Sequence, residues 1–191
     1  MEHSISAKYK NVLLRPIVEN DLELLRHWRN DESNTTYLTK LDYITQKQQQ
    51  DWYKRELSNK DSYIFAIEET ELLNMLVGSI SLYNFNGQTA EYGSIMIGEP
   101  MAHGKGIGFL ALTLCIFIGF NKFNLETIVA SVHEDNTAAV KTNDKVGFSI
   151  CGRHPYKLGG HEHEIVIDKT TFFKIHTWLP EIETDTHPMS I

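Results

Sequence analysis

The sequence predicts an α+β domain in which helices cover both faces of a mixed, mostly antiparallel central sheet. Three observations lead to this prediction. The 191 residues suffice for one sizeable hydrophobic core, and neither a repeat nor a linker divides them. Consecutive segments in the middle of the chain have the apolar, β-branched composition of strands. The expected helices lie mainly before and after this run, which is typical of an α+β protein.

The first half of the chain is expected to form one strand, two helices and three further strands. Pro16 places the end of the first strand near a sheet edge. Asn20 with Glu23, and Thr45 with Gln48, have the spacing of capping boxes that open helices. The expected elements are a strand at Val12–Ile17, helices to Asn30 and to about Leu57, strands at Ser62–Ile67, Met75–Tyr83 and Ala90–Ile97, and a hairpin turn at Asn86–Gly87.

The second half begins with a glycine-rich turn, His103–Gly108, that opens a long apolar helix to about Lys122. Gly147 is expected to end a second helix, because glycine is favoured just past a helix C-terminus. The remaining elements are strands at Thr127–His133, Phe148–Arg153 and Glu164–Phe172, and a helix at Asn136–Lys145. We therefore expect a single domain over residues 1–191, with its core at about 12–172 and a loosely held acidic tail at 179–191.

Composition excludes several classes of protein. With 41% hydrophobic and 23% charged residues, the chain is not collagen-like, coiled-coil or wholly disordered. No stretch approaches the roughly 18 apolar residues of a membrane span, and Met1–Asn11 lacks the apolar segment of a signal peptide. Two cysteines make no disulfide framework, so we expect a cytoplasmic protein. The net charge of −7 argues against nucleic-acid binding but allows a small anionic ligand.

The stretch IMIGEPMAHGKGIG at residues 95–108 carries the strongest functional signal. A strand ends, and three glycines then lead into a helix. Glycines let backbone N–H groups converge, and a helix N-terminus adds partial positive charge, so this turn suits a pyrophosphate. Lys105 adds a charge. The spacing matches neither the G-x-G-x-x-G dinucleotide motif nor the G-x-x-x-x-G-K-[ST] phosphate loop.

At this point the chain resembles the GNAT acetyltransferase superfamily. The family pattern of Gln or Arg, two residues, Gly, one residue and Gly or Ala is matched by His103, Gly106 and Gly108, with histidine in place of the usual first residue. A second segment, NTAAV at 136–140 followed by KVGF at 145–148, is similar to the family's N-x-x-A and K-x-G-F pattern. The resemblance covers about residues 12–172.

The resemblance implies transfer of an acetyl group from acetyl-CoA to a primary amine, by direct attack in a ternary complex. It implies that Ile95, Met96 and Ile97 lie on a strand that splays from its neighbour and pairs with the pantetheine arm, and that the Ile97 N–H stabilises the developing oxyanion. The pyrophosphate would be held by the turn, and Asn136 and Lys145 would lie at the cofactor. The implied turn residues are His103, Gly104, Lys105, Gly106, Ile107 and Gly108.

Glu91 is the candidate general base, because an alkyl amine is protonated at neutral pH and must lose a proton before attack. A period of two places Glu91, Gly93, Ile95 and Ile97 on one face of their strand. The alternatives are a surface glutamate or an ion-pair partner for Arg15 or Arg29. The family tyrosine that protonates the leaving thiolate is replaced by Asn143, which could orient the sulfur. Tyr83 or Tyr92 could supply the proton instead.

The sequence indicates neither a metal site nor a cysteine nucleophile. His161 and His163 alternate with glutamates, but solvated strand positions beside a hairpin tip at Gly159–Gly160 explain that pattern. Cys115 lies in the apolar helix, and no histidine is spaced to activate it.

The acceptor is expected at the first two helices. Arg26, Trp28 and Arg29 lie on or beside the apolar stripe of the first helix, and a partly buried arginine requires an anionic partner. The segments LRHWRN at 25–30 and VGSISLY at 77–83 are similar to family members that act on amino sugars linked to nucleotides, and the arginines suit a diphosphate, so we favour that acceptor. The alternatives are a polyamine or the N-terminus of a ribosomal protein. A non-catalytic acetyl-CoA-binding module is the alternative of another class. Whether the chain forms a homodimer stays open.

Overall fold

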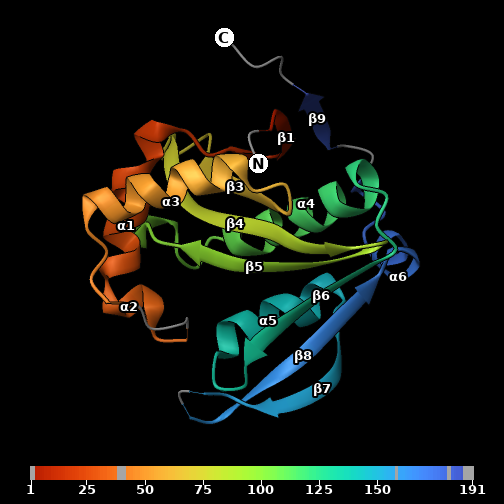
Figure 1. The fold of residues 1–191 in the computed structure, drawn as a ribbon. Helices are drawn as coiled ribbons and strands as arrows, with labels where there is room; N and C mark the ends of the chain where they lie inside the picture. Colours follow the sequence, from red (N-terminus) through yellow and green to blue (C-terminus); the bar gives the residue numbers. More distant parts are fainter. Residues whose placement is uncertain (1–2, 38–41, 158, 180–181, 187–191) are drawn as a thin grey trace.

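The computed structural model describes residues 3–37, 42–157, 159–179 and 182–186, and these form one sheet with helices on both faces (Figure 1). The sheet has nine strands in the order β7-β8-β6-β5-β4-β3-β2-β1-β9. The strands are β1 (Ile5–Tyr9), β2 (Val12–Pro16), β3 (Ser62–Glu69), β4 (Met75–Asn86), β5 (Thr89–Ile97), β6 (Thr127–His133), β7 (Ser149–Pro155), β8 (His161–Asp168) and β9 (Glu183–Thr186).

Helices divide between the two faces of the sheet. The helices are α1 (Leu22–Asn30), α2 (Glu32–Thr35), α3 (Gln46–Ser58), α4 (Ile107–Lys122), α5 (Thr137–Val146) and α6 (Lys169–Ile175). The apolar helix α4 packs against both β2 and β5 in the main core, and its residues from Ala111 to Phe120 are all buried. Leu25 and Trp28 of α1 form a smaller cluster on the opposite face with Ala66 and Met96. The mixed α+β prediction is confirmed.

The sheet parts in its middle. Every neighbouring pair of strands is antiparallel except β5 and β6, which are parallel and pair only over Thr89–Glu91 with Thr127–Val129. Beyond Glu91 the two strands diverge, while β6 stays paired with β8 as far as His133 (Figure 1). The edge of β5 from residue 92 to 97 therefore faces a gap in the sheet.

A bulge in β5 changes which side chains share a face. Ser81 pairs with Gly93, and Ser79 pairs with Met96. Ser94 and Ile95 of β5 therefore both lie opposite Ile80 of β4, which is a β-bulge. Ser94 has a φ of 51°, in the left-handed region. The extra residue shifts the alternation. Glu91 and Gly93 consequently share a face with Met96, and the prediction that Ile95 and Ile97 share it is wrong.

Three further expectations need correction. Asn20 and Glu23 form no capping box, because a 3-10 turn at Glu19–Asp21 precedes α1 and the Asp21 carboxylate accepts from Val18 N–H at 2.8 Å. The last predicted strand ends at Asp168, whose carboxylate caps α6 by accepting from Thr171 N–H at 2.9 Å. β2 is an inner strand between β1 and β3, and only its last residues, Arg15 and Pro16, lack a partner on the β1 side.

The C-terminal segment is held more firmly than we expected, in its described part. Leu179 is buried, and β9 pairs antiparallel with β1 at one edge of the sheet. The capping box that opens α3 is confirmed, since Thr45 N–H donates to Gln48 Oε1 at 2.8 Å and Gln48 N–H donates to the Thr45 hydroxyl at 3.3 Å. Gly147 ends α5 with a φ of 106°, as expected.

Candidate active site

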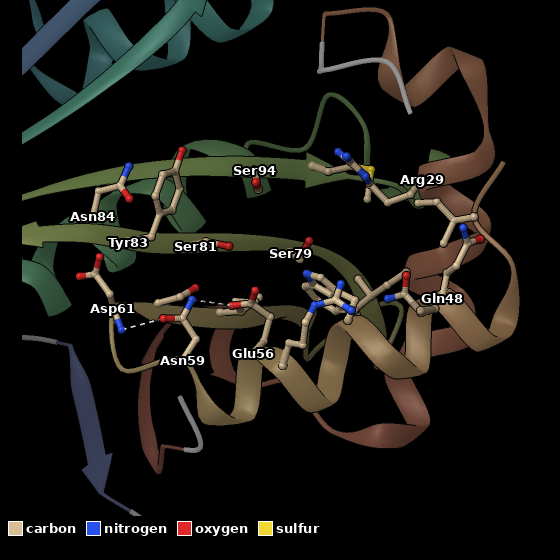
Figure 2. A pocket seen from close by; sticks show the side chains of 18 of the residues that line it. Arg29, Gln48, Glu56, Asn59, Asp61, Ser79, Ser81, Tyr83, Asn84 and Ser94 are labelled. Carbon is tan, nitrogen blue, oxygen red and sulfur yellow. Dashed lines mark hydrogen bonds between the residues drawn. The ribbon is translucent and has the colours of Figure 1, made fainter. Parts of the chain in front are cut away.

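A cavity of about 700 Å³ lies between the sheet and helices α1 and α3. Its floor is the face of β4 and β5 that carries Ser79, Ser81, Tyr83 and Ser94 (Figure 2). Helix α3 contributes the wall, and Arg29 enters from α1. The charged lining residues are Arg29, Asp42, Arg55, Glu56 and Asp61. Figure 2 shows Arg29 near one end of the cavity and Asp61 near the other.

Glu91 lies at the point where β5 leaves β6. Its carboxylate accepts two hydrogen bonds, from the Tyr83 hydroxyl to Oε1 at 3.0 Å and from Asn84 Nδ2 to Oε2 at 2.9 Å. The arginine partners considered from sequence lie elsewhere, because Arg15 pairs with Asp21 at 2.7 Å and with Glu68 at 2.8 Å. Glu91 is thus oriented by two neutral donors, the Tyr83 hydroxyl and the Asn84 amide.

Tyr83 crosses from β4 to β5. Figure 2 shows its ring rising from one strand with the hydroxyl directed past the next. Gly93 gives it room, since a Cβ at that position would stand 2.3 Å from the Tyr83 hydroxyl oxygen. Burial raises the pKa of Tyr83, and the nearby Glu91 charge raises it further.

The backbone after the bulge is tied to the glycine turn by His103. The Nε2 of this exposed histidine lies 2.7 Å from the Ile97 carbonyl oxygen, so Nε2 carries the proton when it donates this bond. Ile95 and Ile97 pack toward α4, with Ile97 3.7 Å from the Cβ position of Gly108. The splayed strand that was expected at Ile95–Ile97 is confirmed by the pairing of β5 and β6.

The glycine turn presents free donors at the start of α4. Gly104 and Gly106 have φ values of 73° and 75°, and a Cβ at either would meet no atom within 4 Å. Within the described part of the chain, the N–H groups of residues 104–109 donate to no backbone or side-chain acceptor. Converging amides at an open helix N-terminus fit a pyrophosphate.

The other predicted cofactor residues have structural partners. Asn136 caps α5 by accepting from Ala139 N–H at 3.1 Å. The Lys145 ammonium lies 4.2 Å from the centre of the Phe109 ring. Asn143 is only 4% exposed, and its amide donates to the Ala139 carbonyl at 2.9 Å while accepting from the Tyr92 hydroxyl. These contacts place Asn143 in the core behind β5, where it links α5 to the sheet through Tyr92, and its contact with the sulfur stays a prediction.

Of the three predicted acceptor residues, only Arg29 lines the cavity. Arg26 is bound to Glu23 at 2.5 Å and to the Ile44 carbonyl at 3.1 Å, so it holds α1 to the segment before α3. Trp28 is 3% exposed and fills the space above Gly98. Burial lowers the pKa of Arg29, and no described acidic residue lies within ion-pair distance of it.

Sequence reasoning missed most of the cavity lining. Asp42, Arg55, Glu56 and Asp61 gave no signal, because none belongs to a motif. The alternation of Ser79, Ser81 and Tyr83 along one strand was the available clue, since polar residues at every second position indicate a face that does not enter the core. Among the described residues, no three His, Cys, Asp or Glu side chains gather closely enough to hold a metal ion.

Comparison with known proteins gives the family of this arrangement. A family model described as acetyltransferase (GNAT) domain matches residues 11–149. The spermidine N(1)-acetyltransferase of Escherichia coli K12 is 26% identical over 176 residues, which is 91% of each chain. An uncharacterized protein of Methanocaldococcus jannaschii is 29% identical over 143 residues, but this chain spans only 28% of its length.

Solved structures agree on the fold. The spermidine N-acetyltransferase of Vibrio cholerae, solved in complex with CoA and spermine, superposes with a TM-score of 0.78 at 20% identity, over 85% of this chain and 98% of that one. A GNAT acetyltransferase from Bacillus anthracis gives 0.73 at 21% identity, over 86% and 99%. Among the described residues, no helix has the length and hydropathy required to cross a membrane.

Proposed function

Because the chain belongs to the GNAT acetyltransferase family, we propose that it moves the acetyl group of acetyl-CoA to a primary amine of a polyamine. One observation carries the transfer chemistry: Glu91, held by two neutral donors, stands where β5 and β6 part, next to the acceptor cavity. The two spermidine acetyltransferases above support the polyamine as the acceptor class.

The open side of β5 and the glycine turn provide a path for the coenzyme. The residues that would hold it are the backbone of Ile95–Ile97, along the pantetheine arm, and the free N–H groups of residues 104–109, at the pyrophosphate. Lys105, which is exposed beside these amides, adds a positive charge. Bound acetyl-CoA supplies the thioester. The Ile97 N–H remains our candidate donor to its carbonyl.

The cavity supplies charges for a long amine. Glu56 and Asp61 line the cavity together with Tyr83, which reaches Glu91, and Asp42 adds a third carboxylate. A polyamine presents one amine for acetylation and a second ammonium some distance away, and a carboxylate attracts that second charge. Asp61 also accepts from Phe85 N–H at 2.7 Å, so its carboxylate has a fixed position.

Arg29 and Arg55 favour a second candidate acceptor. Both line the same cavity, and Arg29 has no described acidic partner. A partly buried guanidinium without a partner fits a carboxylate or phosphate, as in an amino sugar linked to a nucleotide. The family match does not separate this acceptor from a polyamine or from a protein N-terminus.

Acetyl-transfer assays across acceptors test the proposal. The purified chain with acetyl-CoA should release CoA thiol with spermidine or spermine, and less with UDP- and dTDP-linked amino sugars or an N-terminal peptide. Greater activity on the nucleotide-linked sugars would move the acceptor assignment to the second candidate. CoA binding in calorimetry without thiol release on any of these amines would indicate a non-catalytic binding module instead.

A further inference from the structure

Acetyl transfer to an amine needs a proton donor as well as a base. A proton leaves the nitrogen, and one must reach the sulfur. Asn143, at the position where the sequence suggested a helper for the sulfur, is buried and hydrogen-bonded to Tyr92 and Ala139. A side-chain amide does not give up a proton near neutral pH. The donor must therefore be another group at the opening between β5 and β6.

We propose that Tyr83 delivers the proton to the leaving sulfur and that Tyr83 and Glu91 form a two-residue proton relay. This inference rests on the proposed acetyl transfer, and it assigns a role to a residue of β4 that also lines the acceptor cavity. The relay needs no metal and no further side chain.

Three geometric facts carry the proposal. Tyr83 and Glu91 are directly paired across β4 and β5, and the hydroxyl lies 3.0 Å from Glu91 Oε1. The hydroxyl rests on the β5 backbone at Gly93, immediately before the bulge at Ser94. Glu91 is the last residue of β5 that pairs with β6. The phenol therefore stands at the mouth of the gap in which the thioester is expected.

Tyr92 does not fit this role. It lies on the opposite face of β5, in the main core, where it is 4% exposed and its ring contacts Phe148. Its hydroxyl is directed to Asn143. The choice between Tyr83 and Tyr92, which the sequence left open, therefore favours Tyr83.

The charges around Tyr83 suit a relay. In the resting site the Glu91 carboxylate holds the Tyr83 proton, because the negative charge opposes ionisation of the phenol. Asp61, Glu56, Arg55 and Arg29 line the same cavity, yet only Glu91 contributes appreciably to the pKa of Tyr83 besides burial. Once Glu91 accepts a proton its charge is lost, and the phenol becomes a stronger acid at the moment when the sulfur requires one.

The proton steps balance. The amine nitrogen forms a bond to the acetyl carbon while the carbon–sulfur bond breaks. The substrate ammonium first releases one proton to solvent. The neutral nitrogen then loses a second proton to Glu91 as it attacks, and the sulfur takes the hydroxyl proton of Tyr83. Glu91 then returns its proton to the Tyr83 oxygen along their hydrogen bond, so both residues end in their starting states. The products are the acetamide and the free thiol of CoA.

Activity measurements give the first test. In Tyr83→Phe we expect kcat with spermidine to fall by about 10- to 100-fold, while the Kd for CoA in calorimetry changes less than about twofold. The matched control Tyr92→Phe removes a hydroxyl from the other face of the same sheet and should keep the wild-type pH profile of kcat. An unchanged kcat in Tyr83→Phe, or an equal loss and profile change in both variants, would overturn the proposal.

Tyrosine titration gives a test that needs no acceptor. Tyrosinate absorbance of the full chain is followed with rising pH in the wild type, Tyr83→Phe and Glu91→Gln. The titration step that is present in the wild type and absent in Tyr83→Phe belongs to Tyr83. In Glu91→Gln this step should occur at lower pH, because the negative charge that opposes ionisation of the phenol is gone. If its titration does not move, the two residues do not share a proton and the relay is wrong. If instead the wild type turns over no amine while this shift is seen, the proposed function fails and the coupling stands.

A variant that keeps the hydroxyl but displaces it completes the design. In Gly93→Ala the added methyl group would meet the Tyr83 hydroxyl at 2.3 Å, so the phenol must move away from its place on β5. We expect kcat to fall in the same direction as in Tyr83→Phe. Full activity in Gly93→Ala with a displaced phenol would contradict the proposal.

Discussion

At the scale of single residues, the proposed general base, Glu91, is the first group to test. In Glu91→Gln the amide keeps the shape of the side chain but accepts no proton, so the amine must lose its proton to solvent. We expect kcat to fall by about 100-fold or more, while the Kd for CoA in calorimetry stays near the wild-type value. Turnover unchanged at every pH would remove Glu91 from the mechanism.

Arg29 tests the acceptor. Its guanidinium lines the cavity without a described acidic partner, and burial lowers its pKa. For a polyamine this charge is repulsive, so Arg29→Gln should lower the KM for spermidine by about 2- to 10-fold, the effect of one partly screened charge. The matched variant Arg26→Gln removes a guanidinium that lies on the same helix but is bound to Glu23. A raised KM for spermidine in Arg29→Gln would contradict this charge argument.

At the scale of elements, the packing of α1 on the sheet depends on one small residue. A Cβ at Gly98 would lie 2.1 Å from the Trp28 ring. Gly98→Ala must therefore push α1 away, and we expect a loss of about 1–3 kcal/mol of stability in urea unfolding. Gly152→Ala is the control, because it meets mainly the ends of the movable side chains of Glu164 and His154. Equal stability of both variants would contradict this packing.

Local sequence patterns predicted most elements, and they failed where a long-range contact decides the structure. The Thr45 capping box and the glycine at the end of α5 depend on neighbours within a few residues, and both were predicted. Strand β9 exists because it pairs with β1, at the other end of the chain. A four-residue strand of sequence ETDT carries no local signal for such pairing.

The candidate site shows the same division. The glycine turn was predicted from a motif and Glu91 from its place on the strand before that turn, and the roles of both stay predictions. The face of β5 was assigned wrongly, because the bulge at Ser94 is set by the pairing with β4 and inserts one residue into a regular alternation. The cavity residues Asp61 and Arg55 come from separate elements that meet only in the folded chain. Periodicity within one segment does not contain this information.

At the scale of the whole molecule, the lowered pKa values of His3 and Glu69 predict loss of stability in acid. Burial lowers the pKa of His3 to about 4, so the fold favours neutral His3, and its contribution is complete above the ordinary value of 6.5 and is lost as pH falls toward 4. Glu69 is 1% exposed, and although burial opposes its charge, hydrogen bonds from Leu73, Leu72 and Glu71 N–H and from Asn11 lower its pKa to about 2. Its contribution is complete above 4.5 and is lost toward pH 2.

Urea unfolding at a series of pH values measures both contributions. The wild type should lose stability between pH 6.5 and 4, and in His3→Leu this loss should shrink by an amount on the order of 3 kcal/mol, from about 1.4 kcal/mol per pKa unit. Glu69→Gln should be less stable than the wild type at pH 7, and the difference should narrow below pH 4.5. An identical pH dependence in wild type and His3→Leu would show that His3 carries no such linkage.

The parting of β5 from β6 divides the molecule into two unequal leaves, of six strands and three strands in the sheet order, which share a short parallel seam and the helix beneath them. If these two parts of the sheet move relative to each other about the seam, a coenzyme bound between them would restrict that motion. Binding then carries a cost in conformational entropy. Substitutions that make the short β5–β6 pairing more rigid in the free protein would lower this cost and strengthen binding without any new contact to the ligand. Residues of this pairing that do not contact the coenzyme could therefore set its affinity.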